Sequence, residues 1–199
     1  MDLRLVAAPD ALDQRLIAAF WAEVAAHGWH GLSLGRLAAA AGVPAAELRR
    51  RCPTPLHLLG LHGRVADGAV LAGTVPGQGG LARDRVFDVL MRRIDAMQPH
   101  RAGILRLFED VQRDPLLALL LLAALPRSMA WMLEAAEVPA PPTLVGLLRA
   151  KGLTAVWLAV VRAWARDDTA DLGPTMAALD RALDRAEQVA RTLRLEADA

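Results

Sequence analysis

The stretch GWHGLSLGRLAAAAGVPAAELRRRCPTPLHLLGLHGR, residues 28–64, decides the fold of this 199-residue chain. It predicts two short helices followed by the start of a longer one. Ser33 can cap the first helix, because its hydroxyl accepts hydrogen bonds from the free amides of a first turn. Gly42 stands where a left-handed residue ends a helix. The second helix, about residues 45–51, must end before Pro53, because proline disfavours the helical conformation in the residue before it. We interpret the stretch as a helix-turn-helix.

Further helices are predicted on both sides of this motif. Upstream, an amphipathic helix is defined at helical spacing by Leu12, Leu16, Phe20 and Val24. Downstream, Thr54 and Pro55 fit the N-cap and first position of a helix that runs to about Leu71. The glycine-rich segment 73–80 then marks the expected boundary. It separates two predicted domains, residues 1–73 and 81–199.

The second predicted domain consists of helices joined by short connections. The pattern places them at about 81–97, 101–112, 115–136, 143–166 and 174–194. Pro126 should kink the helix 115–136, because it removes a backbone donor and crowds the preceding turn.

The composition agrees with an all-α protein. Apolar residues make up 54% of the chain, tyrosine is absent, and alanine, leucine and arginine, which favour helices, are abundant. The single cysteine, Cys52, excludes an internal disulfide framework and fits a reducing cytoplasm. The N-terminus lacks a signal-peptide pattern. The longest apolar run, residues 116–125, is too short to cross a membrane, so we expect a buried central helix there and a cytoplasmic location.

Charge is concentrated locally rather than globally. The net charge is only +1, so no overall field favours nucleic acid. Within residues 28–64, however, the basic residues are Arg36, Arg49, Arg50, Arg51 and Arg64, against a single acidic residue, Glu47. Such an excess fits phosphate contacts around a recognition helix. It also fits a solvated arginine face, because only Lys151 among the 23 basic residues is a lysine.

Residues 33–59 resemble the TetR family of bacterial transcriptional repressors. The matching positions are Ser33, Leu37-Ala38, Ala41-Gly42-Val43, Leu48, Pro53 and Leu58-Leu59. The chain departs from the usual pattern at Ala46, Arg49, Arg51, Cys52 and Pro55. The resemblance implies an N-terminal DNA-binding domain and a C-terminal domain for dimerisation and ligand binding. On this basis the expected DNA-contacting residues are Ser33, Arg36, Pro44, Ala45, Glu47, Arg49, Arg50, Arg51 and Thr54.

A second resemblance concerns the C-terminal part of the chain. Residues 91–104, 124–136 and 155–183 are similar to the TetR-fold lipid-binding proteins of ubiquinone biosynthesis. That similarity implies an alternative function, an accessory protein that binds an isoprenoid or quinone lipid and has lost DNA binding.

Two further sets of residues are candidates in the C-terminal domain. An apolar ligand pocket could be lined by Phe87, Leu90, Met91, Ile94, Phe108, Met129, Trp131, Met132 and Trp157, although the same residues fit a plain core. A dimer interface could use Val161, Trp164, Met176, Leu179, Leu183 and Ala186, because the last helix carries a narrow apolar stripe with charged flanks. Packing within one chain, or a helix on a membrane surface, would use the same stripe.

No enzymatic or metal site is expected. Gly31, Ser33 and Gly35 match a nucleophile elbow by spacing alone, and that motif requires a strand before the serine. His57 and His62 lie five residues apart and do not share a helical face, so they do not suggest a metal site. Asp167-Asp168 is typical of a turn before the last helix. We therefore expect no cofactor. The resemblance to the TetR family implies a ligand-responsive repressor that binds operator DNA as a homodimer.

Overall fold

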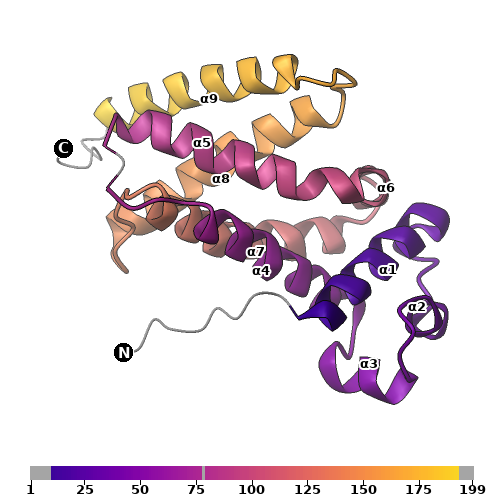
Figure 1. Cartoon of the computed structure of the whole chain (residues 1–199). Coiled ribbons are helices and arrows are strands. Elements are labelled where there is room, and N and C mark those ends of the chain that lie inside the picture. The colour runs from indigo at the N-terminus through magenta and orange to yellow at the C-terminus, as the bar shows by residue number, and fades with distance from the viewer. Residues whose placement is uncertain (1–9, 78, 193–199) are drawn as a thin grey trace. The chain divides into compact units, whose positions relative to one another are not determined.

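The computed structural model describes residues 10–77 and 79–192, and every regular element within those ranges is helical (Figure 1). The elements in chain order are α1 (Ala11–His27), α2 (Leu34–Ala40), α3 (Ala45–Arg51), α4 (Pro55–Ala72), α5 (Ala82–Met97), the 3₁₀ turn η1 (Gln98–His100), α6 (Arg101–Val111), α7 (Pro115–Ala135), α8 (Leu144–Trp164) and α9 (Gly173–Thr192). The all-α prediction is confirmed, and the predicted helices agree with these bounds to within one or two residues. Residues 193 and 194 of the last predicted helix lie outside the described residues.

Local capping explains why the helices begin where they do. The amide of Asp13 donates to Asp10 Oδ1 over 2.7 Å at the start of α1. The amide of Arg36 donates to Ser33 Oγ over 3.3 Å at the start of α2. A Thr143 hydroxyl caps α8 in the same way. Each cap satisfies an amide that has no partner inside its own helix.

The turn between α2 and α3 has the geometry that the sequence predicts. Gly42 has a φ of +66°, a left-handed conformation that glycine adopts without a Cβ clash. The amides of Gly42 and Val43 donate to the carbonyls of Ala39 and Ala38 over 3.1 and 3.0 Å. This pair of bonds is a Schellman motif, which ends α2 sharply.

By packing, the chain forms two compact units. Among the described residues, the first unit comprises those up to Ala69 together with Ala96–Leu119, and the second comprises those within Val70–Asp95 together with those from Leu120 to Thr192. Three helices, α4, α5 and α7, run from one unit into the other. The assignment of separate functions to residues 1–73 and 81–199 stays a prediction.

The first unit has a core made by α1 to α4 and α6. Its fully buried side chains include Leu16, Phe20, Val24, Leu37, Leu48 and Leu58. Helix α6 packs against α1 at close range, because Gly103 faces the backbone of Trp21. The amide of Trp29, just beyond α1, donates to Asp110 Oδ2 of α6 over 2.6 Å. Helix α6 is therefore an integral part of the unit that contains the helix-turn-helix.

The core of the second unit is made by α5, α7, α8 and α9. Its fully buried side chains include Leu90, Ile94, Met129, Met132, Trp164 and Leu179. Helices α8 and α9 pack along one another, and Arg83 of α5 pairs with Asp180 and Asp184 of α9 over 2.6 and 2.7 Å. The connection between α8 and α9 is fixed by Asp167, whose carboxylate accepts bonds from the amides of Thr169 and Thr175 over 3.1 and 2.9 Å.

The expectation of a buried central helix at residues 116–125 is wrong. Helix α7 continues through Pro126, but leucines 116, 119, 120 and 122 are exposed and Leu117 is buried. An apolar run has no polar face to reveal which side of the helix packs inward, so composition alone overstates burial. By length and composition α7 and α8 could each cross a membrane, with 22% and 44% of their most apolar windows buried in the protein.

Candidate nucleic-acid interface

Helix α3 is anchored on one side and exposed on the other. Leu48 and Cys52 are each only 2% exposed, and they fix α3 in the core of the first unit. Cys52 has left the helical conformation, with φ −136° and ψ 82°, as expected for the residue before Pro53. Burial and a neighbouring carboxylate, Asp13, raise the pKa of the Cys52 thiol. The cysteine thus serves packing.

The exposed side of α3 carries two arginines that can reach a ligand. Arg49 and Arg50 are exposed, and they follow Leu48 directly in the helix. Arg50 pairs with Glu47 one turn earlier. Within the described part of the chain, the side chain of Arg49 makes no hydrogen bond or ion pair. Its guanidinium is available for a phosphate or a base edge.

Arg51 has a different, structural position. Its Nε donates to Asp13 Oδ1 over 2.8 Å, and its Nη2 donates to Asp10 Oδ2. These hydrogen bonds, together with the two negative charges, raise the pKa of Arg51. The pairing ties the end of α3 to the start of α1. The partners lie 38 and 41 residues away in the sequence, so no local pattern could have indicated them.

The remaining predicted residues surround this surface. Ser33 caps α2, as described above. Arg36 donates to Glu23 Oε1 over 2.7 Å and to the carbonyl of Gly31 over 2.7 Å, so one edge of its guanidinium is already used. Pro44 precedes α3 and Ala45 begins it, and both are exposed.

Thr54 lies at the start of α4. Its hydroxyl bonds His57 Nδ1 over 2.7 Å, and its carbonyl accepts from the amide of His57 over 3.0 Å. All nine predicted residues thus lie on α2, α3 or the connections next to them. A helix with exposed arginines, held from behind by a buried leucine, can enter a DNA major groove while its flanks contact phosphates.

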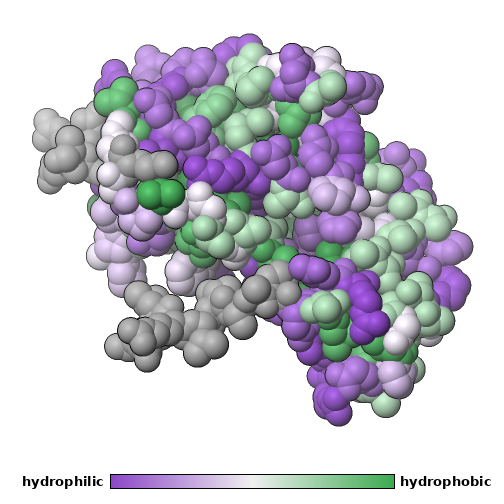
Figure 2. Space-filling view, in the orientation of Figure 1, coloured by the Kyte–Doolittle hydropathy of each residue, from purple (hydrophilic) through white to green (hydrophobic). Residues whose placement is uncertain are grey.

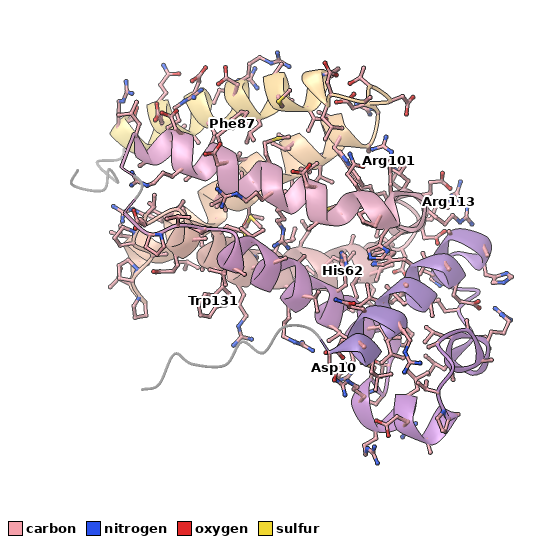
Figure 3. All side chains as sticks on the ribbon, viewed as in Figure 1. Asp10, His62, Phe87, Arg101, Arg113 and Trp131 are labelled. Atoms are coloured by element: carbon pink, nitrogen blue, oxygen red, sulfur yellow. The ribbon has the colours of Figure 1, made fainter. Side chains whose placement is uncertain are left out.

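The residues predicted to line a ligand pocket divide into two groups. Leu90, Ile94, Met129, Met132 and Trp157 are buried. The Arg93 guanidinium lies 5.1 Å from the Trp157 ring and donates to Met132 Sδ over 3.8 Å. Burial lowers the pKa of Arg93 to about 10. Phe87, Met91 and Phe108 are half-buried and Trp131 is exposed (Figure 3). A groove of about 630 Å³ lies between α7 and the start of α8, and it is lined by Pro126, Arg127, Ala130 and residues 140–144, 146, 147 and 150.

The residues predicted for a dimer interface are mostly internal. Val161, Trp164, Leu179 and Leu183 are buried within one chain, where they hold α8 against α9. Met176 is exposed and Ala186 is half-buried.

Histidines and carboxylates do not gather into a metal site in the described ranges. His62 lies edge-on to Trp21 and His100, with ring centroids 5.1 and 5.4 Å apart. Burial lowers the pKa of His100, as expected for an imidazole in an aromatic cluster.

Comparison with solved structures identifies the architecture. A TetR transcriptional regulator from Nitrosomonas europaea superposes with a TM-score of 0.71, covering 90% of this chain and 99% of its own length. The chain has the TetR fold. Sequence identity to that protein is 19%. A TetR transcriptional regulator from a Rhodococcus species also has 19% identity, with a TM-score of 0.60 over 88% of this chain and 95% of its own. No protein-family model and no curated protein sequence matches the chain.

Proposed function

We propose that this TetR-fold chain is a ligand-responsive transcriptional regulator, a repressor that binds operator DNA in the cytoplasm as a homodimer. The observation that carries the proposal is how the side chains of α3 are exposed. Leu48 is buried in the core of the first unit, while Arg49 and Arg50 are exposed to solvent. Both of the solved neighbours described above are regulators by name. In the proposed mechanism, an apolar effector binds among the helices of the second unit and changes the spacing of two recognition helices. Two DNA half-sites fix that spacing, so a small change reduces affinity.

The direct test is binding of the purified full chain to duplex DNA from upstream of its own coding sequence, by fluorescence anisotropy at several salt concentrations. A regulator should prefer one duplex over a scrambled control, with an affinity that falls steeply as salt rises, because phosphate contacts release counterions. Arg49→Ala should weaken binding at least fivefold. If Arg49 contacts a phosphate, the variant should also reduce the slope of log affinity against log salt by about 1.

Matched variants separate DNA contact from a change in charge or folding. Arg185→Ala removes the same charge from an exposed position on α9 and should leave DNA binding unchanged. Arg51→Ala removes the link to Asp13 and should lower the melting temperature as well as DNA affinity, whereas Arg49→Ala should leave the melting temperature unchanged. If Arg49→Ala and Arg50→Ala both bind a verified operator as well as the wild type, α3 is not the recognition helix.

The same experiment distinguishes the alternative drawn from the sequence. An isoprenoid-binding accessory protein would bind every duplex equally weakly and would carry lipid through purification, which mass spectrometry of an organic extract detects. That combination would overturn the regulator proposal.

A further inference from the structure

Helix α3 carries three consecutive arginines, and two of them have acidic partners in the folded protein. Arg50 pairs with Glu47, three residues earlier on the same helix. Arg51 pairs with two aspartates at the start of α1. Among the described residues, the side chain of Arg49 makes no hydrogen bond or ion pair. The charges of Arg50 and Arg51 are thus compensated inside the protein, whereas the guanidinium of Arg49 keeps its donors for a ligand.

Arg49 shares an exposed face of α3 with two alanines. Ala45 lies four residues and Ala46 three residues before Arg49, and residues at these spacings are neighbours on a helix surface. All three are exposed, while Leu48 is 2% exposed and holds the opposite side of α3 in the core. In Figure 2 the surface over α3 shows hydrophilic and apolar residues next to one another. We call Ala45, Ala46 and Arg49 the α3 contact face.

The shape of the α3 contact face suits the edges of bases. Each alanine projects a single methyl group, so the backbone of α3 can come close to the floor of a DNA major groove, which is about 12 Å wide and admits a helix. Arg49 is the one long side chain of the face and can extend past the methyl groups. Beside the face, Glu47 places a carboxylate next to Arg50, and this negative charge disfavours a phosphate at that position.

The two kinds of side chain on the α3 contact face match two different bases. A guanidinium donates two parallel hydrogen bonds, and guanine presents two acceptors, O6 and N7, in the major groove. An alanine methyl group forms no hydrogen bond but packs against the C5-methyl group of thymine. Side chains three or four residues apart on a helix lie about 5–6 Å from one another, whereas base pairs are stacked about 3.4 Å apart. The thymine must therefore lie one or two base pairs from the guanine.

We propose that the α3 contact face recognises a guanine through Arg49 and, one or two base pairs away, a thymine through the methyl groups of Ala45 and Ala46. Arg50 takes no part in base recognition, because Glu47 holds it. The inference rests on the proposed function and deepens it, since it names the base pairs that each half-site must contain. It also assigns a base edge, in place of a phosphate, to Arg49.

The first experiment selects duplexes from a random library with the purified full chain. The enriched sequence should contain, in each half-site, a guanine with a thymine one or two base pairs away. In that duplex, 7-deazaguanine in place of the guanine removes the N7 acceptor and preserves base pairing. Fluorescence anisotropy should then show that wild-type affinity falls about tenfold. Uracil in place of the thymine removes only the methyl group and should weaken binding about fourfold, as expected for one buried methyl group.

Variants assign these losses to individual side chains. Arg49→Ala should bind the guanine and 7-deazaguanine duplexes with equal affinity. The variant should also keep the wild-type slope of log affinity against log salt, whereas the loss of a phosphate contact would reduce that slope by about 1. The matched control is Arg50→Ala, which removes the same charge from the next residue and should retain the full 7-deazaguanine effect. Replacement of Ala45 and Ala46 together by glycine should remove the uracil effect.

Each ratio compares two duplexes bound by the same protein, so a variant with lower stability still gives a valid result. An Arg49→Ala variant that retains the 7-deazaguanine effect, an Arg50→Ala variant that loses it, or a selected sequence with no guanine near a thymine would overturn the inference and leave the regulator standing. A library that yields no preferred sequence would overturn both the inference and the regulator.

Discussion

Gly103 governs how closely α6 approaches α1 in the first unit. A Cβ added at this position would lie 2.4 Å from the carbonyl oxygen of Trp21 and 2.9 Å from its ring. Real side chains do not pack at such distances, so the helices would have to move apart. The glycine is required by tertiary contact, and no signal in the local sequence distinguishes it from Gly63 of α4, which has nothing near its Cβ position.

Gly103→Ala should therefore destabilise the protein by roughly 1–3 kcal/mol, the usual cost of overpacking. Gly63→Ala, the matched control in an open helical position, should stabilise it by up to about 1 kcal/mol, because alanine loses less backbone entropy. Urea denaturation followed by circular dichroism measures both changes. Equal effects of the two substitutions would contradict the close contact.

The residues of the candidate interface show where sequence reasoning succeeds. Ser33, Gly42 and Pro53 act through neighbours within a few positions, so their roles could be predicted from the sequence alone. Arg51 could not be assigned in the same way, because Asp10 and Asp13 reach it only after folding. Of three consecutive arginines, tertiary structure alone separates Arg51, which is paired with two carboxylates at the start of α1, from Arg49 and Arg50, which are not.

At the scale of elements, helix positions were predictable but helix orientation was not. Asp114 with Pro115 fixes where α7 begins, and Thr143 fixes where α8 begins, which is why the predicted starts of these helices agree with the structure. The direction in which α7 faces depends on what packs against it, and a run of leucines contains no periodicity that reports this. The same holds for Leu179 and Leu183, whose stripe on α9 fits an intrachain and an intersubunit partner equally well.

The connection between α8 and α9 should make the second unit sensitive to acid. Hydrogen bonds from Thr169 and then Thr175 lower the pKa of Asp167 from its ordinary 3.8 to about 2. A carboxylate whose pKa is lower in the folded state stabilises that state above the unfolded pKa, and the contribution is lost as the pH falls through the folded value. The loss should therefore occur between about pH 4 and pH 2.

Asp167→Asn should lower the melting temperature at pH 7 and flatten its dependence on pH across this window. Asp95→Asn makes the same change at an exposed position of α5 and provides the control. Differential scanning calorimetry from pH 2 to pH 7 measures the melting temperatures. A wild type and an Asp167→Asn variant whose curves run parallel below pH 4 would show that the carboxylate does not act in this way.

At the scale of the whole molecule, the glycine-rich segment does not divide the two packing units. Its described residues, 73–77, 79 and 80, lie inside the second unit. There the Gly77 amide donates to Glu137 Oε1 over 2.7 Å, and Arg92 donates to the Thr74 hydroxyl over 3.1 Å. Helix α6, which completes the first unit, comes after this segment in the chain.

Cutting the chain here should therefore leave it assembled. A protease recognition site inserted between Gly79 and Gly80 should be cleaved, and the two fragments should elute together from a size-exclusion column under native conditions. In 6 M guanidinium chloride they should separate. Release of a folded N-terminal fragment under native conditions would instead support an independent domain of residues 1–73.

The packing of α6 on α1 also has a consequence for synthesis on the ribosome. Residues 96–119 complete the first unit, so the helix-turn-helix emerges well before its last partner has been translated. At about 5–20 residues per second, several seconds pass in which the apolar side of α1 has no α6 to cover it. During that interval the nascent chain exposes this surface to chaperones and proteases. Because the interval depends on the translation rate, slower codons before residue 101 would lengthen it.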